Sequence, residues 1–167
     1  MSKATDYKDF WQDLKSGQFE TMVRETARGE TINNSKELYN ILKPLYAKEP
    51  DIEKVHFIFL DAKNHILSID CLFQGTLTSA SVYPREIIKS VIKNQAAAVI
   101  MAHNHPSGDP IPSVDDMQIT YKIVVALMSM DVSMHEHIII GTDKYYSLAD
   151  VGEIVTLRTK AHKALNE

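Results

Sequence analysis

Two short segments of the sequence, residues 55–60 and 96–102, are apolar on both alternating sets of positions. This pattern is typical of strands that are covered on both faces, although the alanines of the second segment have low strand propensity. Between them the sequence predicts a returning strand over residues 65–73, a short edge segment over residues 76–81 and a helix over residues 84–94. The chain is therefore expected to form a sheet with helices packed against it.

The remaining elements alternate irregularly along the chain. Ser113 is expected to cap a helix that runs to Met128, residues 137–146 are typical of a second hairpin, and a last helix is expected near residues 152–165. Hairpins mixed with helices favour a mixed sheet layered with helices. Residues 1–34 are polar and predict a helical lead-in to a domain of residues 35–167.

Composition excludes several classes of protein. The chain has 167 residues, enough for one domain with a proper core, and its net charge of -4 is spread without a basic stripe, so nucleic-acid binding is not supported. A single cysteine, Cys71, cannot form an internal disulfide, which favours a reducing, cytoplasmic location. No run approaches the roughly 18 apolar residues that a membrane helix requires, so we expect no membrane partner.

A candidate metal site begins at the end of the second apolar segment. His103 and His105 are two residues apart, so both imidazoles would face the same side of a strand. The next residues, 104–112, contain three prolines and a glycine and predict a fixed loop that returns the start of a helix, with Asp116 in its first turn. Two histidines and one carboxylate leave an open position, which is the pattern of a catalytic zinc site. Water bound there would ionise near neutral pH.

Other interpretations fit parts of this pattern. A His-x-His pair alone is weak evidence, and Asp116 is also explained as the acidic partner of Ser113 in a helix cap. Spacing alone does not separate Asp116 from Asp115, which lies about 100° around the helix. A second pair, His135-Glu136-His137, lacks an acidic helix start after it and is interpreted as structural or surface histidines.

The longer motif resembles a known family. The segment His103-Asn104-His105-Pro106-Ser107-Gly108-Asp109-Pro110 is similar to the signature of RadC-family proteins of the JAB/MPN (JAMM) metalloprotease-like superfamily. That superfamily's pattern is His-x-His, seven residues, Ser, two residues, Asp, and Ser113 and Asp116 fall on its last two places. The resemblance covers roughly residues 35–152 and includes these further segments: Pro84-Arg85-Glu86, Asn94-Gln95-Ala96, His137-Ile138-Ile139-Ile140-Gly141 and Tyr145-Tyr146-Ser147.

The resemblance implies a fold and an activity. The fold would be the α/β JAB/MPN sandwich, a mixed sheet between helices that is related in architecture to cytidine deaminases. One zinc ion per chain would be bound by His103, His105 and Asp116, and the protein would hydrolyse peptide or isopeptide bonds. The hydroxyl of Ser113 would hold the developing oxyanion. A nucleobase deaminase is excluded, because it requires a Pro-Cys-x-x-Cys pair and this chain has one cysteine.

Two glutamates compete for the role of general base. Glu86 lies in the first turn of a predicted helix, where the helix dipole already explains an acid. Glu53 lies at the start of a buried strand, where a charge has less structural explanation, although a surface glutamate remains an alternative. Members of the superfamily carry their catalytic glutamate at the start of the first strand, so the resemblance favours Glu53.

The sequence departs from the family before residue 35. Full-length RadC proteins resemble a helix-hairpin-helix module followed by the catalytic domain, whereas the 34 residues before Ser35 are too few for that module. The alternative function, a RadC-like accessory protein of DNA repair or replication, therefore transfers poorly to this chain.

Overall fold

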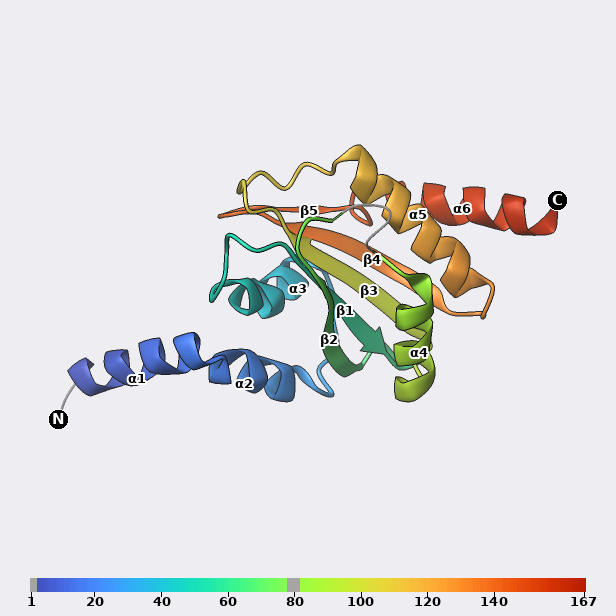
Figure 1. The fold of residues 1–167 in the computed structure, drawn as a ribbon. Helices are drawn as coiled ribbons and strands as arrows, with labels where there is room; N and C mark the ends of the chain where they lie inside the picture. The colour runs from blue at the N-terminus through green and yellow to red at the C-terminus, as the bar shows by residue number, and fades with distance from the viewer. Residues whose placement is uncertain (1–2, 78–81) are drawn as a thin grey trace.

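A five-stranded mixed sheet forms the centre of the molecule (Figure 1). The computed structural model describes residues 3–77 and 82–167, with side chains from residue 10 onward. The strand order is β2-β1-β3-β4-β5, in which only β3 and β4 are parallel neighbours. The strands are β1 Lys54–Leu60, β2 Ile66–Gln74, β3 Ala98–Asn104, β4 Ser133–Ile140 and β5 Tyr145–Ser147. The expectation of a mixed sheet is confirmed.

Helices cover both faces of this sheet, as expected for an α/β sandwich. The helices are α1 Lys3–Ser16, α2 Gln18–Ala27, α3 Ser35–Leu42, α4 Pro84–Asn94, α5 Val114–Met128 and α6 Glu153–Asn166, with a 3₁₀ turn, η1, at Lys43–Tyr46. Helices α4, α5 and α6 pack on one face, and α2, α3 and η1 pack on the other.

Each face has its own hydrophobic core, because alternate residues of the strands point to opposite sides. Phe57, Phe59 and Met101 face the layer of α4 and α5, and none of them is exposed to solvent. Ile58 and Ile100 face the layer of α3 and η1. The central strands β1 and β3 are buried at every position, which explains why their sequences are apolar on both parities.

Most predicted boundaries lie within one or two residues of the observed ones, but β4 begins at Ser133, four residues before the predicted start of the second hairpin at residue 137. Strand β3 is shifted by two residues. It begins at Ala98 and ends at Asn104, so His103 lies inside the strand rather than after it. Pro44 interrupts α3, which ends at Leu42 and continues as the η1 turn. Of the predicted edge segment 76–81, the first two residues form no strand, and residues 78–81 lie outside the described part of the chain.

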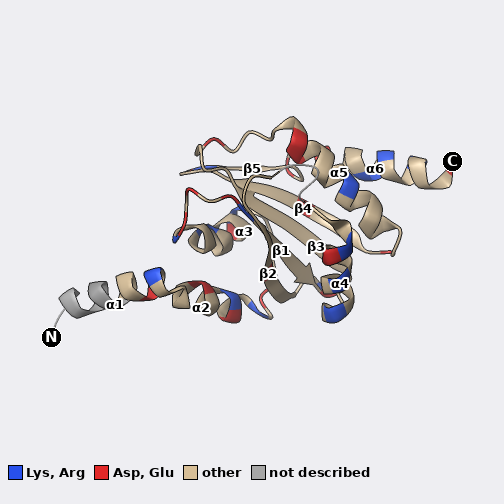
Figure 2. Cartoon of the chain, in the orientation of Figure 1, with Lys and Arg blue, Asp and Glu red and all other residues tan. Residues whose placement is uncertain are grey.

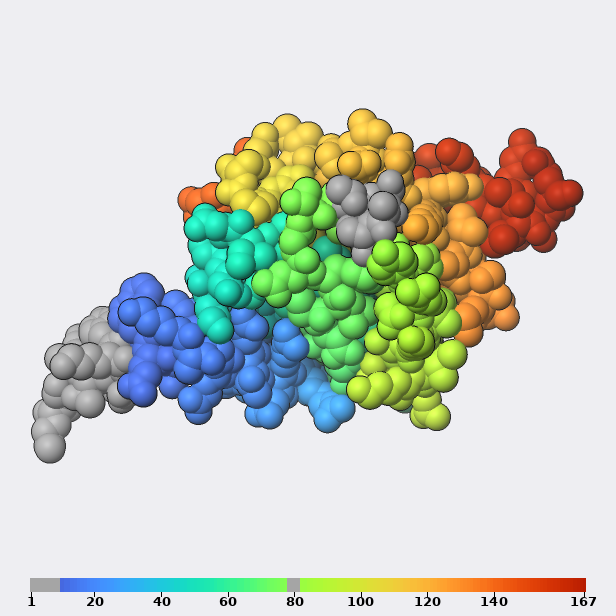
Figure 3. All heavy atoms as spheres, in the orientation of Figure 1, coloured from blue at the N-terminus to red at the C-terminus, as the bar shows by residue number. Residues whose placement is uncertain are grey.

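The lead-in consists of two helices at the end of the molecule opposite α6 (Figures 1 and 3). Val23 and Ala27 of α2 reach the core, whereas Phe10, Trp11 and Met22 are 44%, 56% and 49% exposed. Acidic and basic residues are interspersed along α2 and α4 (Figure 2). Within residues 3–77 and 82–167, every helix is too short or too polar to cross a membrane.

Candidate metal centre

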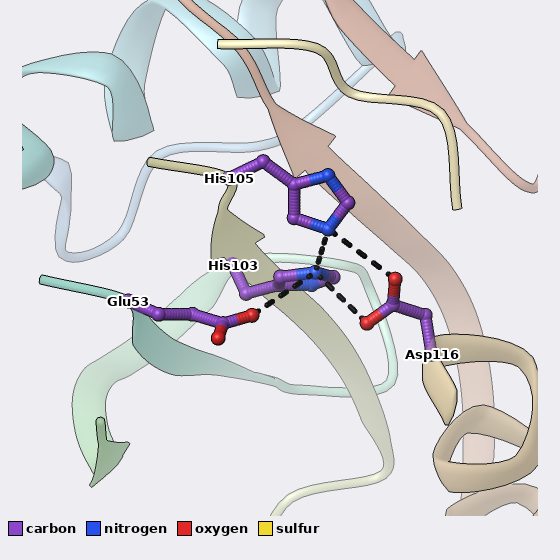
Figure 4. A group of neighbouring side chains, drawn as sticks. All are labelled: Glu53, His103, His105 and Asp116. Atoms are coloured by element: carbon purple, nitrogen blue, oxygen red, sulfur yellow. Dashed lines mark hydrogen bonds and ion pairs between the residues drawn. The ribbon is translucent and has the colours of Figure 1, made fainter. Parts of the chain in front are cut away.

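Four side chains converge at one end of the central strands (Figure 4). Each of Glu53, His103, His105 and Asp116 offers one ligand atom, and these atoms lie within 4.8 Å of one another. The Nε2 atoms of His103 and His105 are 2.9 Å apart. The two carboxylate oxygens of Asp116 lie 3.1 Å from Nε2 of His103 and 3.2 Å from Nε2 of His105. Glu53 Oε1 is farther away, 3.9 Å from Nε2 of His103.

Strand direction explains why Glu53 joins the two histidines. Strand β1 is antiparallel to β3, and its second residue, Val55, lies opposite His103. The start of β1 therefore meets the end of β3, and Glu53, which immediately precedes β1, lies beside the histidines. The N–H groups of Gly75 and Leu77 donate to the Glu53 carbonyl and to its Oε2, both at 2.8 Å. These bonds fix the glutamate in place.

The loop after β3 is held against the β4–β5 hairpin. Gly108 has a φ of 80°, its N–H donates to the carbonyl of His105 at 2.9 Å, and its own carbonyl accepts from Thr142 N at 3.1 Å. A Cβ atom on Gly108 would overlap the hydroxyl of Thr142, so only glycine fits this turn. The fixed loop returns the chain and places the first turn of α5 beside the histidines.

A capping box at the start of α5 aims Asp116 at the site. Ser113 Oγ accepts from Asp116 N at 3.1 Å, while Asp116 Oδ2 accepts from Ser113 N at 2.7 Å and from Ser113 Oγ at 2.6 Å. Asp116 is 2% exposed and lies within the converging group, whereas Asp115 is exposed and is not part of it. The cap and the candidate ligand are thus the same residue, and the alternative left open by spacing falls on Asp116.

The electrostatics of the site favour a positive charge at its centre. Burial opposes ionisation of Asp116, but hydrogen bonds from His103 and His105 outweigh it and hold the pKa of that carboxyl well below its ordinary value. The hydrogen bond to Asp116 raises the pKa of His105. Nδ1 of His105 lies 2.7 Å from the carbonyl oxygen of Asp109 and must donate to it, since a carbonyl only accepts. The other ring nitrogen of His105, Nε2, faces the Asp116 carboxylate.

These groups fit a zinc ion chemically. Two imidazole nitrogens and a carboxylate oxygen are the donor set of catalytic zinc, and the histidine nitrogens and Asp116 point to one place (Figure 4). A metal cation held by these three groups would balance the negative charge of the Asp116 carboxylate. Glu53 lies at the edge of this group, 15% exposed in its side chain, where it can contact a water or a substrate.

Asn104 is a supporting residue of the site that sequence reasoning missed. Its side chain points away from the two histidines, and its Oδ1 accepts from Lys54 N at 2.8 Å. Its Nδ2 donates to the carbonyls of Pro50 and Ile52 at 3.3 and 3.1 Å. Asn104 therefore fixes the segment that carries Glu53. A buried polar residue between two candidate ligands was the only sequence signal.

The remaining candidates lie outside the group. His135 is exposed, with Nε2 3.1 Å from Asn64 Oδ1, and His137 is fully buried behind His103. Burial lowers the pKa of His137 well below its ordinary value, so this imidazole is neutral. Glu86 lies on α4 and forms ion pairs with Arg85 and Lys89.

Fold and site together define an α/β sandwich domain with a candidate metal centre at the carboxyl end of a buried strand. The chain belongs to the RadC-like JAB domain family, whose match covers residues 32–153. The resemblance noted from the sequence is thereby confirmed.

Curated relatives support the same assignment. The chain is 40% identical over 119 residues to a UPF0758 protein of Symbiobacterium thermophilum, a match that covers 71% of this chain and 50% of the relative. It is 41% identical over 133 residues to a UPF0758 protein of Methanosarcina mazei, covering 80% of this chain and 57% of the relative. The matched region thus spans between 50% and 57% of the length of these relatives.

Proposed function

We propose that the protein is a zinc-dependent hydrolase that cleaves peptide or isopeptide amides, with His103, His105 and Asp116 as the metal ligands. The observation that carries the proposal is the convergence of these three side chains with a second carboxylate, Glu53, at their edge. Three protein ligands leave a position open for water or substrate, as catalytic zinc requires. Bound zinc would polarise the scissile carbonyl and lower the pKa of the attacking water.

Glu53 is assigned as the general base. One carboxylate oxygen, Oε2, accepts from Leu77 N, while Oε1 points toward the histidines (Figure 4). A carboxylate in this position accepts the proton of the attacking water and returns it to the leaving amine. Asn104 supports this role by fixing the segment that precedes β1.

Ser113 is assigned as the group that stabilises the oxyanion. It is exposed at the start of α5, and its hydroxyl is 2.6 Å from Asp116 Oδ2, so it lies directly beside the third ligand. A hydroxyl donor at this position would bind the carbonyl oxygen as it becomes negative.

A cavity lies beside His105, on the side of the sheet that α3 and η1 cover. Its volume is about 210 Å³. Its wall is partly apolar and includes Tyr46, Pro50, Pro106, Ile140 and Thr142.

The matched pair Glu53→Gln and Glu86→Gln tests the proposal. Glu53→Gln should keep its zinc and its fold but lose hydrolysis by roughly 10²–10⁴-fold, because the amide cannot accept the proton. Glu86→Gln makes the same chemical change at a partly exposed position of α4 and should retain activity. Zinc is measured by elemental analysis, and turnover is measured on a panel of peptides and isopeptide-linked conjugates. Full activity in Glu53→Gln, or loss confined to Glu86→Gln, would contradict the assignment.

A further inference from the structure

A chain of buried side chains lies behind His103, on the side away from the other candidate ligands. His103 Nδ1 is 2.8 Å from His137 Nε2, and His137 Nδ1 is 2.6 Å from Thr120 Oγ1. Thr120 Oγ1 is in turn 2.6 Å from the backbone carbonyl oxygen of Asp116. His103, His137 and Thr120 are each 0% exposed, so water does not compete for these bonds. The chain therefore begins on one candidate ligand and ends on another.

The donors in this chain can be assigned from its last member. The Asp116 carbonyl only accepts, so the single hydroxyl proton of Thr120 must be donated to it. Thr120 then has only lone pairs to offer, and His137 Nδ1 must donate to it. His137 is fully buried and its hydrogen-bond partners are an imidazole and a hydroxyl, not a carboxylate, so its ring carries one proton. That proton is on Nδ1, so Nε2 accepts, and His103 Nδ1 must donate to it. Every bond then runs in one direction.

We infer that His137 and Thr120 are positioning residues that hold His103 in the tautomer protonated on Nδ1, leaving its Nε2 to bind the metal. The inference rests on the metal site of the proposed function. Histidine ligands usually donate their second N–H to a carboxylate, a carbonyl or water, which fixes both ring orientation and tautomer. Here a buried imidazole performs that task, and Thr120 fixes the tautomer of that imidazole in turn.

The fold supplies this arrangement through two neighbouring elements. Strand β4 is parallel to β3, and Ile139 lies opposite His103. His137 precedes Ile139 by two residues on β4, so its side chain lies on the same face of the sheet as that of His103. Thr120 lies one helical turn after Asp116 on α5, so its hydroxyl bonds to the carbonyl four residues before it. The same turn of α5 thus carries the candidate ligand Asp116 and the last side chain, Thr120, of the hydrogen-bonded series that orients the candidate ligand His103.

The tautomers can be measured directly by long-range ¹H–¹⁵N NMR of the histidine rings in the metal-free protein. The inference predicts that His137 is neutral with its proton on Nδ1 and that His103 keeps a proton on Nδ1, before and after zinc is added. A proton on Nε2 of His137, or none on Nδ1 of His103, would overturn it. Because the metal-free spectrum decides this point, the result stands apart from whether zinc binds.

Thr120 variants test whether the chain matters for the metal. Thr120→Val keeps the shape of the side chain but leaves His137 Nδ1 without an acceptor, and zinc affinity should fall about 10–100-fold. Thr120→Ser restores the hydroxyl and should bind zinc as the parent does. Thr159→Val is the matched control, since Thr159, at an exposed position of α6, makes the same bond to the carbonyl four residues earlier.

Zinc affinity is measured by competition with a chelator, and the fold is checked by circular dichroism. Equal affinity in Thr120→Val and the parent would overturn the inference. Absence of zinc binding in the parent would instead refute the proposed function, and the ring tautomers would still decide the inference.

Discussion

The chain carries two His-x-His pairs on neighbouring parallel strands, but only the histidines of the first pair converge on one point. In the first pair, at the end of β3, the Nε2 atoms of His103 and His105 are 2.9 Å apart and face Asp116. In the second pair, on β4, His135 is exposed while His137 is fully buried. Equal spacing therefore did not give equal geometry.

A bulge in the pairing of β4 explains part of the difference. The register shifts between Val99 and Ile100, which lie opposite Met134 and Glu136, so His135 is the extra residue. Side chains two residues apart share a face only where the pairing is continuous. The first pair also has the start of α5 returned to it, and the second pair has no such helix. Spacing predicts a metal site only when strand register and a third ligand agree with it.

The middle residues of the two pairs, Asn104 and Glu136, have similar roles. Each forms hydrogen bonds that hold a neighbouring segment on the face of the sheet opposite His103. Asn104 fixes the segment before β1. Glu136 accepts hydrogen bonds from Ser35, Ser147 and the backbone N–H of Ala149, which tie the start of α3 to β4. Burial raises the pKa of Glu136, although these donors oppose the shift. On these two strands, one face of the sheet thus carries the candidate ligand His103 and its neighbour His137. The other face carries side chains that hold neighbouring segments in place.

His56 on β1 shows that burial alone does not make a histidine a candidate metal ligand. It is as buried as His103, but Arg24 Nη2 lies 3.5 Å from its Nε2, and its Nδ1 has no hydrogen-bond partner among the residues that the structure describes. Burial, together with the nearby positive charges of Arg24 and Lys54, lowers the pKa of His56 to about 3. The folded state therefore keeps His56 neutral, while the unfolded chain binds a proton near pH 6.5.

The stability contributed by neutral His56 is complete above pH 6.5 and is lost as the pH falls toward 3. Between pH 7 and pH 5 this one group should remove about 2 kcal/mol from the free energy of unfolding. His56→Leu cannot titrate and should lose less stability over the same interval, whereas His162→Leu, on exposed α6, should behave as the parent. Denaturant unfolding at both pH values is the measurement. Identical losses in the parent and His56→Leu would contradict the prediction.

Substitution of Ser113 should have a smaller effect on stability. It tests the start of α5, the helix that lies beside the first His-x-His pair and not beside the second. Ser113→Ala removes the capping hydroxyl and should lower the stability of the metal-free protein by about 1 kcal/mol. Ser113→Asn still caps α5 and should recover most of that loss, yet its turnover should stay reduced by roughly 10²–10³-fold if the hydroxyl stabilises the oxyanion.

Asp115→Asn is the control for Ser113, because Asp115 is exposed in the same turn. Thermal unfolding and turnover are measured on all three variants. A folded Ser113→Asn variant with parental turnover would leave Ser113 with a capping role only.

The part of the site that is local in sequence could be predicted, since His103, His105 and Asp116 lie within one strand, one loop and one helix turn. The sandwich of helices on a mixed sheet followed from apolar patterning and from resemblance. Glu53 was different. Its place depends on the antiparallel pairing of β1 with β3, 50 residues away. The charge at the start of a buried strand made it a candidate, and the family resemblance decided in its favour.

The supporting residues could not be predicted in the same way. Asn104, Thr120 and His137 are brought to the site by strand register and by the α5 helix turn, and no spacing rule links them. The bulge at His135 is equally invisible in the sequence, because nothing in the segment Met134–Glu136 specifies an extra residue. Long-range pairing therefore set the limit of prediction here.

Zinc content of three purified proteins tests the metal site most directly. The parent and His135→Ala should each contain about one zinc ion per chain by elemental analysis, because His135 lies outside the converging group. His105→Ala, with one of three ligands removed, should contain almost none while circular dichroism shows a folded protein. Stoichiometric zinc in His105→Ala, or loss of zinc in His135→Ala, would contradict the site described here.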